Sequence, residues 1–218
     1  EMAKAALELG YSYIGICDHS KAAAYANGLN EARVRAQWAE IDKVNETLNG
    51  IRVLKGIEVD ILGDGRLDFD DEFLAEFDVV VASIHSKFSM SETEATERVI
   101  RAIENPQVDI LGHLTGRLLL SREGYPLNIR AVIDAAAETH TAIEINANPA
   151  RLELDWRHLA YAKEKGVKIP INTDAHHILG LSDMHFGVGI ARKGGLEVGD
   201  VQNALCLTDF LASIKGQA

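Results

Sequence analysis

Side chains that bind metal ions well follow several short apolar runs of this sequence. Asp174 and His176 come directly after the run 167–171, which has the composition of a buried strand. One Asp-x-His pair is weak evidence, but four more apolar runs upstream end in a His or a Glu. Such a pattern predicts a metal site built at the tips of successive strands. The candidate metal ligands are His19, Glu58, His85, His113, Asp174 and His176.

The mixture of imidazole and carboxylate ligands suits Zn²⁺, Mn²⁺ or Fe²⁺ better than Ca²⁺ or Mg²⁺. Six ligands are too many for one tetrahedral ion, so the site is predicted to be multinuclear, with Glu58 as a bridge. Two ions about 4 Å apart can hold the attacking and leaving oxygens of a displacement at phosphorus and lower the pKa of a bound water. The predicted chemistry is hydrolysis of a phosphate ester by a metal-activated water, with Glu58, Asp174 and His176 as catalytic residues.

A phosphate ester also needs hydrogen-bond donors or cations besides the metal ions. Arginine suits this role because its guanidinium can make two parallel hydrogen bonds to one phosphate. Four residues that follow predicted strands are therefore expected to contact substrate, although each alone would also fit an ordinary surface or turn position. These predicted substrate-binding residues are Lys87, Arg117, Asn146 and Arg151.

The predicted strands alternate with predicted helices along the whole chain. This order favours parallel strands with right-handed crossovers. An open doubly wound sheet gathers its ligand-binding residues at one switch point, whereas an α/β barrel uses the C-terminal ends of many strands. Because polar residues end nearly every run, the barrel is favoured. Six strands are predicted, over 11–17, 51–60, 77–84, 108–111, 141–146 and 167–171.

Capping patterns delimit the helices. Ser91 and Glu94 have the spacing of a capping box, and Asn30, Asn128 and Asp155 stand where N-caps are expected. The predicted helices cover 2–9, 31–48, about 91–104, 128–139 and 155–165, and loops and helices are expected over 180–215. His140 and His158 then fall at ordinary helix positions, while the roles of His177 and His185 stay open.

The composition limits the possible partners. The 218 residues fit a single domain over 1–218 with a net charge of −11, which argues against broad electrostatic binding of nucleic acid. Metal ions could still hold a nucleotide or a DNA end locally. The sequence has no run of 18 apolar residues, no visible signal peptide and two widely separated cysteines, so we expect a cytoplasmic protein without a membrane span.

Five motifs in order, CDHS, GIEVDI, SIHSKF, GHLTGR and NTDAHH, resemble the PHP (polymerase and histidinol phosphatase) superfamily of metal-dependent phosphoesterases. The segments EINANPARLELDWR, GRLLLSREGYPL and FGVGIARKGGLE are similar to the C-terminal PHP domain of bacterial family X DNA polymerases. The resemblance covers essentially the whole chain. The ordered set is highly specific, whereas any single motif is not.

The resemblance implies a distorted (β/α)7 barrel with up to three divalent ions. It implies a manganese-dependent 3′–5′ exonuclease that processes DNA 3′ ends or nucleotide phosphate esters beside a polymerase domain. Related free-standing proteins hydrolyse small esters such as histidinol phosphate. By the motifs, Glu58, His85 and His113 would hold one ion, His19 and His176 would serve a second, and Asp174 and Glu58 would serve the third.

The sequence departs from the family in one respect. The first family strand, with its His-x-His pair, is missing, which agrees with six predicted strands instead of seven. Because the chain starts at Glu1 within a helical pattern, we expect an internal fragment that keeps the ion of Glu58, His85 and His113 best. Two alternatives stay open: a small-molecule phosphatase, and an inactive structural module that accompanies a polymerase.

Overall fold

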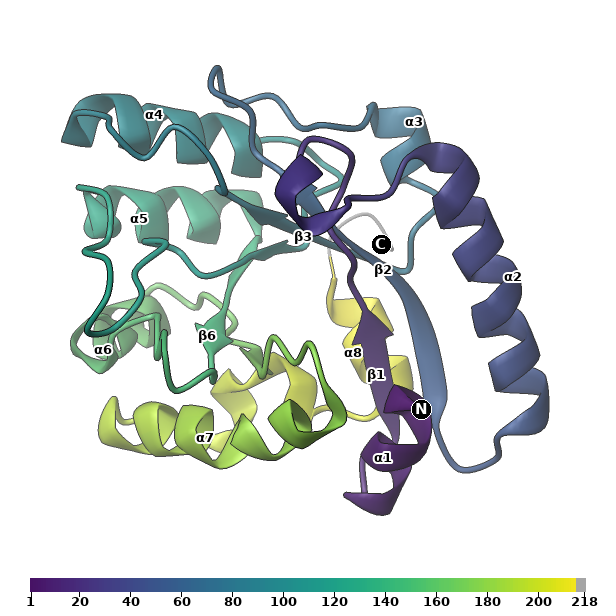
Figure 1. Ribbon diagram of the computed structural model, residues 1–218. Helices are drawn as coiled ribbons and strands as arrows, with labels where there is room; N and C mark the ends of the chain where they lie inside the picture. Colours follow the sequence, from purple (N-terminus) through teal and green to yellow (C-terminus); the bar gives the residue numbers. More distant parts are fainter. Residues whose placement is uncertain (215–218) are drawn as a thin grey trace.

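Parallel strands lie at the centre of the protein, and helices cover their outer side (Figure 1). The computed structural model describes residues 1–214. One sheet has the order β1-β2-β3-β4-β5, and a second pairs β6 with β7. All of these ladders are parallel, which confirms the α/β class. The strands are β1 (Tyr13–Ile16), β2 (Arg52–Asp60), β3 (Val79–Ser83), β4 (Ile110–Leu111), β5 (Ala142–Ile143), β6 (Ile145–Asn146) and β7 (Ile171–Asn172).

The predicted helices are present with nearly the predicted bounds. Ser91 and Glu94 form the capping box, and the side chains of Asn30, Asn128 and Asp155 each accept a backbone hydrogen bond at a helix start. The predicted segment 180–215 is helical over much of its length, and its last residue lies outside the described residues. The α-helices are α1 (Met2–Glu8), α2 (Glu31–Thr47), α3 (Asp71–Leu74), α4 (Glu92–Ile103), α5 (Ile129–Thr139), α6 (Trp156–Glu164), α7 (Met184–Lys193) and α8 (Leu207–Ser213). The 3₁₀ helices are η1 (Ala24–Ala26), η2 (Ile178–Asp183), η3 (Val198–Asp200) and η4 (Gln202–Ala204).

The predicted strand 141–146 serves both sheets. Its first half, β5, pairs with β4, and its second half, β6, pairs with β7. The amide of Ile143 donates to the carbonyl of Lys168 at 3.1 Å, so the segment runs between two neighbours along its length. Each strand therefore lies next to the strand that follows it in the sequence, from β1 to β7. Within residues 1–214 no ladder joins β1 to β7, and closure into a seven-stranded barrel stays a prediction.

Residues that alternate along the strands form two separate cores. Outward-facing side chains such as Ile57, Val80 and Ile143 belong to the large core beneath the helices. Inward-facing side chains such as Leu54 and Val81 pack with α8 in a second cluster. The predicted metal ligands lie outside this cluster, at the C-terminal ends of the strands. The second cluster of buried residues contains Leu54, Val79, Val81, Ile110, Ala142, Phe210 and Ile214.

Two glycines let the strand tips approach one another. A Cβ on Gly56 would lie 2.4 Å from the sulfur of Cys17, and one on Gly112 would lie 2.4 Å from the hydroxyl of Ser83. Both distances are too short for real atoms, so larger residues would push the strands apart. Gly56 precedes Glu58 by two residues and shares its face, which brings β1 and β2 together beneath that carboxylate.

A buried arginine fixes the loops after β2 and β3. The guanidinium of Arg98, on α4, is 3% exposed and donates to the carbonyls of Ile61, Leu62 and Ser86. The first two carbonyls directly follow β2, and the third directly follows His85. Arg98 thus ties together the backbone segments that follow two predicted metal ligands, Glu58 and His85. Within residues 1–214, every helix is too short or too polar to cross a bilayer.

Candidate metal centre

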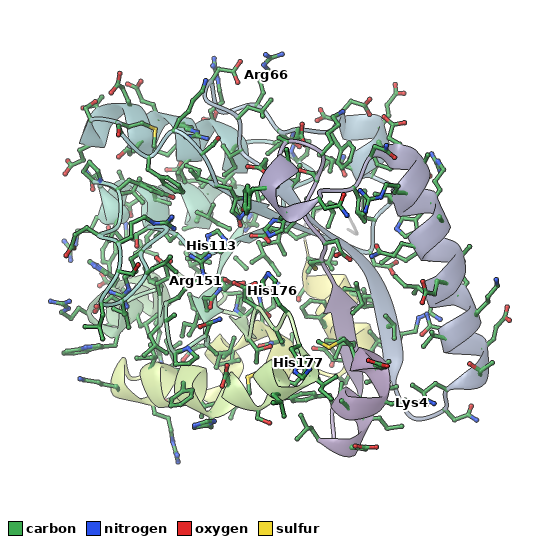
Figure 2. All side chains as sticks on the ribbon, in the orientation of Figure 1. Lys4, Arg66, His113, Arg151, His176 and His177 are labelled. Atoms are coloured by element: carbon green, nitrogen blue, oxygen red, sulfur yellow. The ribbon has the colours of Figure 1, made fainter. Side chains whose placement is uncertain are left out.

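Four of the six predicted ligands meet at the C-terminal ends of neighbouring strands. Glu58 lies in β2, and His19, His85 and His113 follow β1, β3 and β4 within three residues. Nε2 of His113 lies 2.8 Å from Oε1 of Glu58, and Nε2 of His85 lies 3.1 Å from the same oxygen. The Nε2 atoms of His85 and His113 are 3.2 Å apart. Figure 2 labels His113, Arg151 and His176 in the middle of the view.

The two oxygens of Glu58 face different partners. Oε1 faces His85 and His113, whereas Oε2 lies 3.2 Å from Nδ1 of His19. A carboxylate whose two oxygens face separate imidazoles can share in metal binding with either set, and its predicted role as a bridge stays a prediction. Ligand atoms of His19, Glu58 and His85 all lie within 4.8 Å of one another, and this group can hold a metal ion.

Asp174 and His176 lie at the rim of this group. The rings of His19 and His176 have centroids 6.3 Å apart, and His176 is mostly exposed. Asp174 has a left-handed backbone with φ 51°, and its Oδ2 lies 3.4 Å from Nε of Arg151 and 3.2 Å from Nδ2 of Asn146. Asp174 therefore contacts an arginine and an amide in this structure. That Asp174 and Glu58 bind one ion together stays a prediction.

The buried imidazoles and carboxylate shift one another's pKa values. Burial alone would raise the pKa of Glu58, but hydrogen bonds from His113 and His85 and their charges hold it well below its usual value of 4.5. Burial would lower the pKa of His85, but Asp60 and Glu58 together raise it to about 9. Burial dominates at His19 and lowers its pKa. Glu58 is thus an anion at neutral pH, as a metal ligand must be.

The residues present fit divalent metal ions. Their ligand atoms are imidazole nitrogens and carboxylate oxygens, the donors preferred by Zn²⁺ and Mn²⁺. Two buried atoms at the group, Nδ1 of His113 and Oδ2 of Asp60, make no hydrogen bond within the described residues. Such atoms are costly to bury, and metal binding nearby would compensate some of that cost. Glu58, His19, His85 and His113 are the residues that would hold the ions.

The raised pKa of His85 predicts an unusual pH dependence of stability. Because the pKa rises from 6.5 to about 9 in the folded protein, the stabilising contribution of His85 is complete below pH 6.5 and is lost as the pH rises through about 9. The melting temperature of the metal-free protein should therefore fall between pH 7 and pH 9.5. Mn²⁺ should remove this fall, because ions bind the deprotonated imidazole. Thermal melts in EDTA and in Mn²⁺ measure both curves.

A matched variant separates this effect from other titrations. In His85→Gln, the decline between pH 7 and pH 9.5 in EDTA should be shallower than in the unmodified protein. An equal decline in both proteins, or an equal decline with and without Mn²⁺, would contradict the assignment of His85.

Two of the predicted substrate-binding cations lie in different surroundings. Arg151 stands beside Asp174, and its buried Nη1 makes no hydrogen bond within the described residues and lies 3.9 Å from Glu153. Lys87 is exposed on the loop after β3, where its amino group lies over Gly63. Their contact with an anionic substrate stays a prediction.

The other two predicted substrate contacts have structural partners instead. The guanidinium of Arg117 donates to the carbonyls of Arg151 and Leu152 and to Asp155, so it holds the loop that carries Arg151. Asn146 is completely buried and donates to Glu144 and Asp174. Both side chains thus have partners within the protein, and their predicted contact with substrate stays a prediction.

The sequence interpretation missed three buried carboxylates around the group. Asp60 lies 3.3 Å from Nδ1 of His85 and can orient that ring. Glu144 accepts hydrogen bonds from the backbone amide of His113 and from the side chains of Asn146 and Asn172, and its pKa is raised, chiefly by burial. The third is Glu153, which accepts from the amide and hydroxyl of Thr115. Asp60 could have been found, because it shares a strand face with Glu58.

Sequence comparison relates the whole chain to a polymerase-linked nuclease. The protein named DNA polymerase/3′-5′ exonuclease PolX of Bacillus subtilis (strain 168) is 49% identical over 215 residues, which are 99% of this chain and 38% of PolX. The chain therefore spans well under half the length of that relative. A scan against protein-family profiles gives no match.

Smaller relatives match over most of their own length. A probable phosphatase of Acetivibrio thermocellus is 33% identical over 184 residues, which are 81% of this chain and 71% of that protein. The crystal structure of histidinol phosphate phosphatase from Lactococcus lactis, complexed with zinc, L-histidinol and phosphate, shares the fold. It superposes with a TM-score of 0.54 at 17% identity, over 89% of this chain and 86% of the other. With the strand-tip cluster of His19, Glu58, His85 and His113, these likenesses place the chain in the PHP (polymerase and histidinol phosphatase) family.

Proposed function

We propose that this protein is a metal-dependent phosphoesterase that acts at DNA 3′ ends, as the 3′–5′ exonuclease domain of a family X DNA polymerase. The observation that carries the proposal is the convergence of three imidazoles on the two oxygens of Glu58. The likeness to PolX over 99% of the chain supports DNA as the substrate class and a polymerase domain as the partner in the full-length protein. A cytoplasmic location accords with this role and stays a prediction.

The residues of the site divide the work between ion binding and substrate binding. Divalent ions bound here would polarise the phosphate ester and lower the pKa of a water molecule. Glu58 and the three imidazoles would hold those ions, and Asp60, 3.3 Å from Nδ1 of His85, would orient that ring. Arg151 and Lys87 would bind phosphate oxygens of the substrate. Asp174 orients Arg151 through the contact at 3.4 Å, while the exposed His176 can hold or accept a proton near the substrate.

The choice of substrate can be tested directly. In Mn²⁺, the protein should release nucleotides from the 3′ end of a 5′-labelled oligonucleotide faster than it releases phosphate from histidinol phosphate. The measurement is kcat/KM for both substrates with the same preparation. Faster hydrolysis of histidinol phosphate would contradict the exonuclease proposal.

A small-molecule phosphatase is the second candidate, because a relative named probable phosphatase and a histidinol phosphatase structure resemble this chain. If kcat/KM is higher for histidinol phosphate than for the oligonucleotide, the small-molecule phosphatase is the better assignment. A protein that binds Mn²⁺ and hydrolyses neither substrate would instead be the structural module considered from the sequence.

A further inference from the structure

An aromatic ring lies beside the metal-binding group without a clear structural role. Tyr25, in η1, has its ring centroid 6.0 Å from that of His19 and 6.3 Å from that of His85. The side chain is 72% exposed, so it contributes little to the core. Of the exposed large hydrophobic residues within 1–214, Tyr25 alone has ring contacts with this group.

The loop that carries Tyr25 is held firmly. The amide of Leu29 donates to the carbonyl of His19 at 2.7 Å, and the guanidinium of Arg33 donates to the carbonyls of Asn27 and Gly28 at 2.9 and 3.0 Å. A Cβ on Gly28 would lie 1.9 Å from the carbonyl oxygen of Ser20, so the loop closes tightly on itself. The exposed ring is thus presented by an ordered backbone, which lowers the entropy lost when a ligand packs against it.

Tyr25 offers an exposed aromatic face next to the metal-binding group. The protein carries a net charge of −11, so a nucleotide gains little from general electrostatic attraction. Stacking on an aromatic ring does not depend on that charge and accepts every base.

We infer that Tyr25 forms a base-binding subsite, in which its ring stacks on the nucleobase of the nucleotide whose phosphate lies at the metal-binding group. This inference rests on the proposed function, since it names the part of a 3′-terminal nucleotide that the site recognises besides its phosphate. It makes Tyr25 a specificity-determining residue.

The test compares two ligands that differ only in the base. Binding of 2′-deoxyadenosine 5′-monophosphate and of 2-deoxyribose 5-phosphate to the Mn²⁺-loaded protein is measured by calorimetry. The nucleotide should bind about 10-fold more tightly than the sugar phosphate, as expected for one base stacked on one ring. Tyr25→Ala should remove that preference and leave the affinity for the sugar phosphate and for Mn²⁺ unchanged.

Two further variants define the cause. Tyr25→Phe keeps the ring and should keep the preference, and Phe186→Ala, which removes an exposed aromatic ring from α7, should also keep it. The inference is overturned if the unmodified protein binds both ligands equally or binds neither. It is also overturned if Tyr25→Ala keeps the preference, or if Tyr25→Phe loses it as fully as Tyr25→Ala.

Cleavage of an oligonucleotide by the same preparations separates this inference from the proposed function. A Tyr25-dependent preference without cleavage would support the subsite and reject the exonuclease. Cleavage without a preference would support the exonuclease and reject the subsite.

Discussion

Replacing Glu58 with glutamine will lower Mn²⁺-dependent phosphoester hydrolysis by more than about 100-fold, which is the upper end of the loss for a residue that only orients a metal ligand. The expected effect is larger because Glu58 faces His19 through one oxygen and His85 and His113 through the other. A neutral amide can neither bridge two ions nor balance their charge. Hydrolysis rates and Mn²⁺ affinity by calorimetry should fall together.

The Glu58→Gln variant should remain folded. Glutamine has nearly the same shape, and without the carboxylate His85 and His113 lose a main cause of their raised pKa values, so they become neutral more easily. Circular dichroism at pH 8 should match that of the unmodified protein. A folded variant that keeps full activity and Mn²⁺ affinity would show that Glu58 does not hold the ions.

Replacing His85 or His113 with alanine should also abolish Mn²⁺-dependent release of nucleotides. Their Nε2 atoms lie 3.2 Å apart and share one oxygen of Glu58, so either loss leaves one ion short of a ligand. We expect rates lower by at least about 100-fold, since loss of a ligand exceeds loss of its hydrogen-bond partner. Rates with an oligonucleotide, together with metal content, measure the effect.

His140→Asn is the matched control for these two variants. His140 follows α5 and stands just before β5, at the opposite end of the strands from the metal-binding group. Its backbone has φ 57°, a conformation that asparagine tolerates well. This variant should keep its activity. If His85→Ala and His113→Ala were folded and as active as His140→Asn, the proposed site would be wrong.

Local sequence patterns were sufficient to predict most of the fold. The caps at Asn30, Ser91 and Asp155 act within a few residues, so a local pattern was enough to locate these helix starts. The C-terminal ends of the strands could be predicted because apolar runs in the sequence end in polar residues. The predicted strand 141–146 was divided by the structure because its two halves pair with different strands, which no local pattern encodes.

The sequence predicted those site residues that stand in, or within a few residues after, a predicted strand. His19, Glu58, His85 and His113 do so and meet as expected. The structural role of Arg117 was not predicted, because its guanidinium donates to carbonyls more than 30 residues away along the chain. Contacts of that kind depend on the tertiary fold, as do the buried position of Asn146 and the place of Tyr25 beside His19.

Anomalous diffraction from crystals of the Mn²⁺-loaded protein tests the central claim most directly. The account predicts manganese peaks within bonding distance of Glu58 and of the imidazoles of His19, His85 and His113. Ordered manganese bound elsewhere, with these four side chains bound only to one another or to water, would contradict it.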